Sequence, residues 1–188
     1  TILNDDASLG IAATNANLAE GNSGSTPFTF TVTRTGDTSG TASANWAVTG
    51  AWVDAADFGG TLPSGVVNFA AGQTSATITV NVAGDTVVEG DEGFTVTLSN
   101  ATGAGIGVGS ASGTVLNDDA SLSIAATNAS LAEGNSGTTP FTFTVTRTGD
   151  TSGAASANWT VTGAGADAAD FSGGLPSGVV NFAAGQTS

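Results

Sequence analysis

The chain has 188 residues, of which 16 are acidic and 2 are basic, giving a formal net charge of −14. A surface this acidic repels nucleic acid and anionic lipid, so neither is an expected partner. There is no Cys and no His, which excludes disulfides, thiolate nucleophiles and the usual Ser–His–Asp and Cys–His catalytic sites. No apolar run reaches the roughly 18 residues of a membrane span, so direct membrane insertion is not expected.

Alternating apolar and polar residues predict strands along the first 116 residues. Phe28, Phe30 and Val32 alternate with threonines, and the same pattern recurs at 76–82 and 94–98. Period-two alternation over five to eight residues is typical of a half-buried strand. The pattern predicts strands near residues 7–13, 27–34, 41–48, 66–69, 74–82, 93–99 and 108–116. Seven short strands with Gly-, Asn- and Asp-rich connections predict an all-β fold, an antiparallel β-sandwich.

The sequence repeats itself with an offset of 113 residues. Residues 1–75 align on 114–188 without a gap, and ten of those 75 positions differ. A period this long corresponds to one whole domain and not to a turn of a solenoid. The repeat predicts the end of a preceding repeat at 1–6, a complete repeat at 7–119 and a second, C-terminally incomplete repeat at 120–188.

Most acidic residues fall between the predicted strands. The segment 85–92 carries four acids, of which Asp85, Glu89 and Glu92 can turn toward one point. Gathered carboxylates repel one another by about 1 kcal/mol per pair at 4 Å even in water, so they need a cation or dispersal into solvent. Oxygen ligands on a flexible loop suit Ca²⁺, whereas zinc, copper and iron–sulfur sites favour His or Cys. Spacing alone leaves two interpretations open, a calcium site and a solvated acidic turn.

Six motifs follow one another along the unit. They are Leu-Ala-Glu-Gly-Asn-Ser-Gly at 18–24, Phe-Thr-Val-Thr-Arg-Thr-Gly-Asp at 30–37, Asp57-Phe58, Val-Asn-Phe-Ala-Ala-Gly-Gln-Thr at 67–74, the acidic loop and strand at 85–98, and Asn-Asp-Asp at 117–119. In this order they resemble the Calx-beta domain, and the resemblance covers the whole 113-residue unit. It implies an immunoglobulin-like antiparallel β-sandwich of about seven strands, repeated in tandem, as in sodium–calcium exchangers and long bacterial surface proteins.

The resemblance also implies Ca²⁺ as the cofactor, bound by a cluster of acids at one tip of the sandwich. Carried over residue by residue, the metal ligands are Glu20, Asp57, Asp85, Glu89, Glu92, Asp118 and Asp119. In the second copy only Glu133 and Asp170 match, and Asp5 and Asp6 belong to the copy before, so these four form partial neighbouring sites. Asn117 stands at an edge where the family can carry more Asp, which implies fewer or weaker ions.

These observations predict a non-enzymatic, calcium-binding structural repeat of an extracellular or cell-surface protein, expected in bacteria. Ala120 follows Asp119 with no Gly/Ser or Pro linker, so calcium bound there is expected to stiffen the inter-domain joints of an adhesin-like stalk or matrix protein. Neighbouring repeats of the same chain are the expected partners. Two alternatives stay open. One is a subunit of a self-assembling extracellular filament, with other copies of the chain as partners in a fibre. The other is a calcium-sensing regulatory module.

Overall fold

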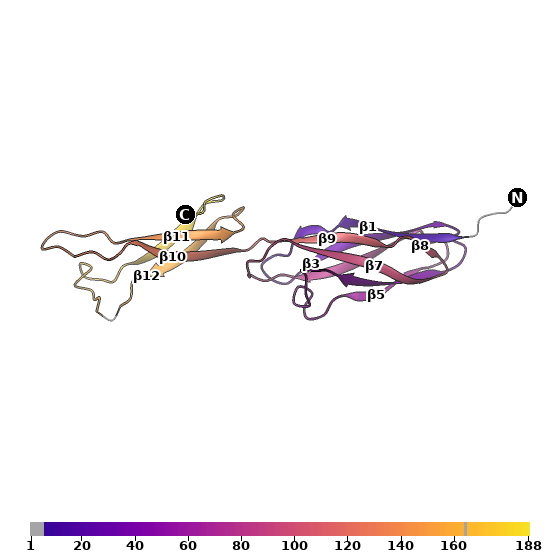
Figure 1. Ribbon diagram of the computed structural model, residues 1–188, viewed down its shortest axis with the longest axis horizontal. Helices are drawn as coiled ribbons and strands as arrows, with labels where there is room; N and C mark the ends of the chain where they lie inside the picture. Colours follow the sequence, from indigo (N-terminus) through magenta and orange to yellow (C-terminus); the bar gives the residue numbers. More distant parts are fainter. Residues whose placement is uncertain (1–5, 164) are drawn as a thin grey trace. The chain divides into compact units, whose positions relative to one another are not determined.

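The computed structural model describes residues 6–163 and 165–188, and strands are its regular elements (Figure 1). The chain divides into two compact units, the first ending at Asp119 and the second spanning Ala120–Ser188. No helix in the described residues is long and apolar enough to cross a membrane. Asp5, one of the predicted ligands of a neighbouring site, lies outside the described residues.

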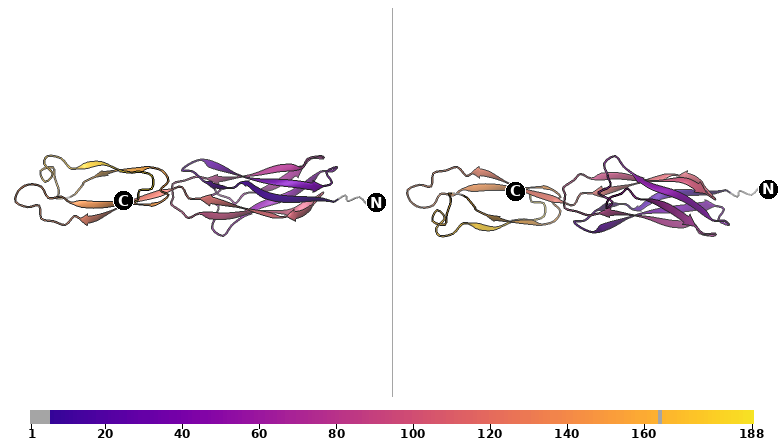
Figure 2. Two further views of the ribbon diagram at one scale, coloured as in Figure 1. Left: turned by 90° about the horizontal axis from the view of Figure 1, so that it is seen from above. Right: turned by 90° about the horizontal axis from the view of Figure 1, so that it is seen from below.

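The first unit is a two-layer β-sandwich (Figure 2). Its strands in the described residues are β1 (Ala7–Asn15), β2 (Asn17–Ala19), β3 (Ser25–Gly36), β4 (Ala42–Thr49), β5 (Ser64–Phe69), β6 (Ser75–Ala83), β7 (Glu92–Thr102), β8 (Gly105–Val108) and β9 (Ser110–Leu116). One sheet has the order β6-β3-β1-β8, and the other has the order β2-β9-β7-β4-β5. The sandwich predicted from alternation is therefore confirmed.

All seven predicted strands are present, and β2 and β8 are additional to them. β2 has only three residues, and every residue of β8 is exposed, so neither shows the buried alternation that identifies a strand from sequence. β8 pairs in parallel with β1 and includes Val108, which the alternation assigned to the last predicted strand. That last strand, β9, begins at Ser110 instead.

The inward faces of the two sheets form one apolar core. Phe28 and Phe30 of β3 are fully buried. The ring of Phe94 on β7 lies edge-on to them, with centroid distances of 5.7 Å to Phe28 and 5.9 Å to Phe30, and also lies 5.9 Å from the ring of Phe58. Gly113 of β9 pairs with Phe94 of β7, and a Cβ at that glycine would lie 2.6 Å from the Phe94 ring. Glycine at this position therefore lets the central ring sit between the sheets.

The second unit repeats the local pairings of the first. Its strands are β10 (Ala120–Asn128), β11 (Thr142–Gly149), β12 (Ala155–Thr160) and β13 (Ser177–Phe182). β10 pairs with β11, and β12 pairs with β13, in registers that match β1–β3 and β4–β5 at the repeat offset. Among the described strands, β11 and β12 each have one partner, whereas β3 and β4 each have two.

Candidate metal centre

The acidic site of the first unit lies at the end of the sheet where β2 and β9 pair in parallel. β2 and β9 run in the same direction, with Ala19 opposite Leu116. Glu20 and the segment 117–119 therefore leave the sheet side by side. β7 runs antiparallel to β9, so Glu92, its first residue, lies at the same end of the sheet. Three chain segments distant in sequence thus deliver carboxylates to one place.

Backbone hydrogen bonds bring two further loops to this end of the unit. The N–H of Ala83, where β6 ends, donates to the carbonyl of Asp57 at 2.6 Å. The N–H of Gly84 donates to the carbonyl of Gly24 at 3.1 Å. A Cβ at Gly84 would overlap the carbonyl of Gly21, so this close approach requires glycine. The β4–β5 and β6–β7 loops are therefore held beside Glu20.

Six of the seven predicted ligands gather into two groups. The inner cluster is Glu20, Asp85 and Asp119, and the outer cluster is Asp57, Glu89 and Glu92. Within each cluster, one carboxylate oxygen of every residue lies within 4.8 Å of the others. The seventh ligand, Asp118, accepts a hydrogen bond from the N–H of Gly21 at 3.3 Å. Each cluster therefore offers three carboxylates to a cation, with Asp118 beside the inner cluster.

Two of the three inner-cluster acids, Glu20 and Asp119, are buried, whereas Asp85 is exposed. Glu20 is 5% exposed and Asp119 is 2% exposed. Burial, with added repulsion from Asp85 and neighbouring acids, raises the pKa of Glu20 to about 7. Burial also raises the pKa of Asp119, and repulsion from Asp118 and Asp85 raises it further. The Asn22 amide, donating to Asp119 Oδ1 at 2.8 Å, opposes that rise. The other oxygen, Asp119 Oδ2, is buried and accepts no hydrogen bond.

The outer cluster is more open to solvent. Glu89 is exposed, whereas Asp57 and Glu92 are half-buried. Desolvation raises the pKa of Glu89 and of Glu92, and repulsion from Asp57 adds to both shifts. The outer cluster is therefore a place where three carboxylates lie close together, two of them with raised pKa values, and where water still reaches them.

Within the first unit, the basic side chain lies away from both clusters. The single basic residue of the first unit, Arg34, lies near the far end of β3, about 30 Å along the strand from its first residue. Its Nη1 donates to the carbonyl of Gly40 at 2.8 Å. Hydrogen bonds from Ser39, with a contribution from the Arg34 charge, lower the pKa of Asp37. No basic side chain of the first unit therefore balances the charge of the acidic end.

Asn117 organises the site, although the sequence analysis gave it no role there beyond its place in the Asn-Asp-Asp motif and named it as a departure toward fewer charges. Its side-chain oxygen accepts from the N–H of Glu89 at 3.2 Å, and its amide nitrogen donates to the carbonyl of Asp119 at 3.1 Å. Its own N–H donates to Asp91 Oδ1 at 3.0 Å. Asn117 thus links one residue of each cluster. Its position beside two predicted ligands was the only signal in the sequence.

The partial sites have fewer carboxylates together. Glu133 and Asp170 line one cavity of the second unit, of about 560 Å³. The N–H of Asp167 donates to Asp170 Oδ2 at 2.8 Å. Asp6 accepts from the N–H of Asp37 through its carbonyl at 3.2 Å. Among the described residues, neither Glu133 with Asp170 nor Asp6 belongs to a group of three acids that could hold a metal ion.

The fold and the acidic end together define a β-sandwich module with a candidate cation site. The profile of the Calx-beta domain matches residues 4–121, which is more than half of the chain. The chain therefore belongs to the Calx-beta family. Membership of this family agrees with the expectation that the chain is not an enzyme. No curated protein sequence matches the chain.

Three solved Calx structures share this fold. The apo-form Calx CBD1 domain is 25% identical, with a TM-score of 0.53, and the match covers 61% of this chain and 99% of that one. CBD12 from CALX1.2 is 22% identical with a TM-score of 0.56, covering 96% of this chain and 72% of that one. The calcium binding domain CBD12 of CALX1.1 is 23% identical with a TM-score of 0.51, covering 86% and 65%. The last two support the fold alone.

Proposed function

We propose that the acidic end of the first unit binds Ca²⁺, with the inner cluster as its principal site. The observation that carries this proposal is the burial of Glu20 and Asp119 beside Asp85, with Asp119 Oδ2 lacking any hydrogen-bond donor. Buried carboxylates need a partner, because desolvation and mutual repulsion both disfavour their charged form. A divalent cation between them supplies that partner and removes the repulsion.

The ligand chemistry favours calcium among the common metals. Every candidate ligand is an oxygen, since the chain has no His and no Cys. Calcium takes six to eight oxygens in flexible geometry, whereas Mg²⁺ usually keeps waters and takes one or two carboxylates. Two adjacent groups of three carboxylates suit the larger ion. Membership of the Calx-beta family, for which the sequence resemblance implied Ca²⁺, supports the same choice.

The surrounding groups have distinct roles in this proposal. Glu20, Asp85 and Asp119 supply oxygens to the ion, and Asn22 fixes the orientation of Asp119. Asn117 holds the backbone of the acidic loop, so that loop residues reach the ion without a large ordering cost. The outer cluster, being more exposed, is the weaker site and exchanges its ion more readily.

The wider role we assign is an extracellular, adhesin-like stalk or matrix protein, expected on a bacterial surface. Asp119, an inner-cluster residue, is one peptide bond from Ala120, where β10 begins. An ion held by Asp119 restricts the backbone at the start of the next unit and stiffens the joint. The near-identical repeat supports a spacer, because a spacer can be copied without changing its role. Weak extracellular sites, of about 10⁻⁴ to 10⁻³ M, fill in calcium-rich surroundings.

A calcium-sensing regulatory module is the second candidate, favoured by the likeness to the Calx CBD1 domain. A sensor needs a conformational readout on binding, whereas a spacer needs only stiffening. Small-angle scattering of the full chain with calcium and with chelator separates them. A narrower distribution of dimensions with an unchanged fold of the first unit supports the spacer, and a rearranged first unit supports the sensor.

Thermal unfolding tests calcium binding itself. An ion at 100 times its dissociation constant adds about 2.7 kcal/mol to the folded state, so calcium raises the melting temperature of the first unit and chelator reverses the rise. Glu20→Gln and Asp119→Asn should remove most of this rise. Asp37→Asn is the matched control, because Asp37 is a half-buried acid of the first unit outside both clusters. An unchanged melting temperature on adding millimolar calcium to the unsubstituted chain would contradict the proposal.

A further inference from the structure

β6 is the longest edge strand of the first unit. In the described residues of this unit, the strands at the ends of the two sheets are β6, β8, β2 and β5. β6 has nine residues and β5 has six, whereas β2 and β8 are shorter still. β6 pairs with β3 at nine consecutive positions without a register shift, so its outer edge is regular along its whole length.

The hydrogen bonds at the start of β6 show which of its main-chain groups face outward. The N–H of Arg34, where β3 nears its end, donates to the carbonyl of Thr74 at 2.8 Å. In an antiparallel pair, every second residue bonds to the partner strand. The even-numbered residues of β6 therefore bond to β3, and the N–H and C=O groups of its odd-numbered residues point away from the sheet.

The outward groups are capped at the two ends of β6 and open in the middle. The carbonyl of Ser75 accepts from the Gln73 side-chain amide at 2.8 Å, and the N–H of Ala83 donates to the carbonyl of Asp57 at 2.6 Å. Between these ends lie three odd-numbered, exposed residues, Thr77, Thr79 and Asn81. Within the part of the chain that the structure describes, no strand pairs with this side of β6.

This edge lacks the features that prevent strands of different molecules from pairing. Natural edge strands are blunted by charged side chains, by Pro or by bulges. β6 has none of these, and residues 58–84 contain no charged side chain. Its neighbour β3 is also uncharged over residues 25–33. With a net charge of −14, two copies of the chain repel each other over most of their surface, and this uncharged edge is where they can approach.

We propose that β6 is a self-association site, at which two copies of the chain pair their β6 strands antiparallel about a two-fold axis. The axis passes beside Thr79, so that Thr79 faces Thr79 of the second copy and Thr77 faces Asn81. Each of these residue pairs exchanges two main-chain hydrogen bonds, and opposed threonine side chains add to the contact. The pairing joins two four-stranded sheets into one. It uses neither acidic cluster, so it is independent of calcium binding.

Sedimentation of the full 188-residue chain, in chelator at about 0.15 M salt, tests the association. We expect a dimer that forms with rising concentration. Thr79→Glu places two carboxylates opposite each other and should weaken dimerisation about tenfold or more. Thr97→Glu is the matched control, because it adds the same charge at an exposed position of β7, which has strand partners on both sides. Mixing the Thr79→Glu and Thr79→Lys chains should restore the dimer.

Cross-linking tests the register, since the chain has no Cys of its own. Thr79→Cys should form a disulfide-linked dimer, because Cα atoms of a hydrogen-bonded pair lie about 5.5 Å apart, within disulfide range. Thr77→Cys should not link to itself, since an offset of four residues separates the two positions by about 13 Å. It should link to the Asn81→Cys chain. Hydrogen exchange of the dimer should show new protection in β6.

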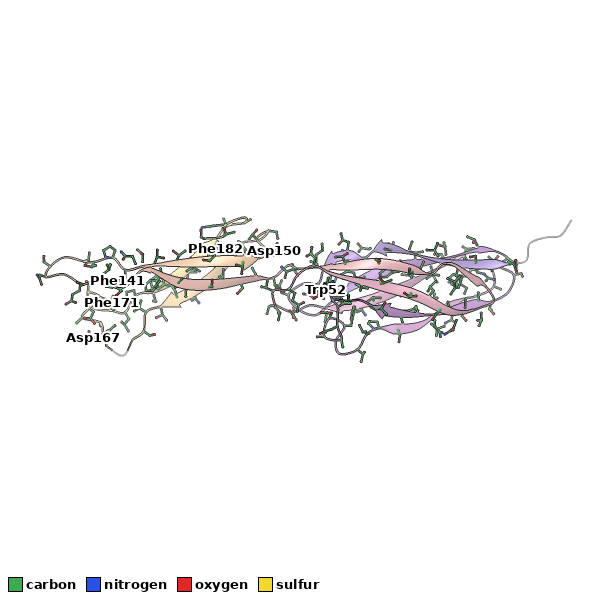
Figure 3. The ribbon with its side chains drawn as sticks, in the orientation of Figure 1. Trp52, Phe141, Asp150, Asp167, Phe171 and Phe182 are labelled. Atoms are coloured by element: carbon green, nitrogen blue, oxygen red, sulfur yellow. The ribbon has the colours of Figure 1, made fainter. Side chains whose placement is uncertain are left out.

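Trp52 is the main competing contact on the first unit. It is 77% exposed, the highest value among the large apolar side chains of the described residues, and it lies in the β4–β5 loop (Figure 3). Association through this ring would not involve a strand edge. Trp52→Ala should therefore leave dimerisation and the Thr79→Cys cross-link unchanged.

Several results would overturn the proposal. One is the absence of self-association at millimolar chain, and another is equal dimerisation of the Thr79→Glu and Thr97→Glu chains. Cross-linking of Thr77→Cys to itself would show a different register. Loss of the dimer in Trp52→Ala but not in Thr79→Glu would identify the β4–β5 loop as the contact. None of these results bears on calcium binding by the first unit.

Discussion

At the scale of single residues, Glu20 is the most informative side chain. Its carboxyl group is buried next to other acids, so its pKa rises from 4.5 to about 7. The folded protein therefore holds a proton there between pH 4.5 and 7, where the unfolded chain has released it. Without a cation, the ionised carboxylate of Glu20 destabilises the folded protein. With a cation bound, the same buried carboxylate serves as a ligand.

The stability of the calcium-free protein should consequently fall as the pH rises from about 5 to 8. A shift of this size corresponds to at most about 3 kcal/mol, present as a penalty above pH 7 and absent below pH 4.5. Denaturant melts in chelator at several pH values measure it. Glu20→Gln should flatten the profile without abolishing it, because the pKa values of Glu89, Glu92 and Asp119 are also raised.

Calcium should reverse the sign of that dependence, since the ion binds the deprotonated carboxylates. The stabilisation produced by calcium should then be larger at pH 8 than at pH 5.5. A calcium effect independent of pH would contradict the assignment of Glu20 as a ligand.

Asn117→Ala tests the residue that joins the two clusters. The substitution removes the hydrogen bonds to the N–H of Glu89 and the carbonyl of Asp119, while all seven acids remain. Residues that orient metal ligands typically affect affinity by 10- to 100-fold, so calcium affinity should fall by about tenfold. Calorimetric titration measures the loss. Asn68→Ala is a matched control, because Asn68 lies on β5 and belongs to neither cluster.

At the scale of elements, β7 is the strand on which the first unit depends most. It pairs with both β4 and β9, its first residue belongs to the outer cluster, and Phe94 contacts three rings of the core. Stability and the metal site are therefore coupled through one strand.

Phe94→Ala should destabilise the first unit by about 3–5 kcal/mol, because a large buried ring is lost and a cavity remains. Chemical denaturation followed by hydrogen exchange in residues 7–119 measures the change. Thr97→Ala on the exposed face of β7 should cost far less. A loss below about 1 kcal/mol in the Phe94 variant would show that the core repacks around the missing ring.

The elements also show where sequence reading works and where it stops. Strands with buried alternation, such as β3, β6 and β7, are visible in the sequence because each inward position is apolar. β2 has no such pattern, yet its parallel pairing with β9 places Glu20 beside Asp119. The candidate ligands followed from motif resemblance, but their division into two clusters follows from this pairing.

At the scale of the whole molecule, the two units differ in how far their apolar residues are covered. Ile11, Phe28 and Phe30 are at most 3% exposed in the first unit. Their counterparts Ile124, Phe141 and Phe143 are 63%, 44% and 54% exposed. Equal sequences thus have different burial, because the strands that cover them in the first unit have no counterparts among the described strands of the second.

The two units should therefore unfold separately, with the second unit first. Hydrogen exchange of the full chain should give strong protection in 7–119 and weak protection in 120–188. Calcium should increase protection in the first unit and, through Asp119, at the start of β10, since both three-acid clusters belong to the first unit. Uniform strong protection across both units would contradict this expectation.

The sequence by itself determined the seven strands with alternating residues, the repeat and the placement of acids between strands, because alternation and loop composition are local properties. Only the tertiary structure decided that Glu20 and Asp119 are buried, that Asp119 Oδ2 has no donor, and that Asn117 links the two clusters. Burial and pKa shifts depend on which segments distant in sequence pack together, and local periodicity does not show which segments those are.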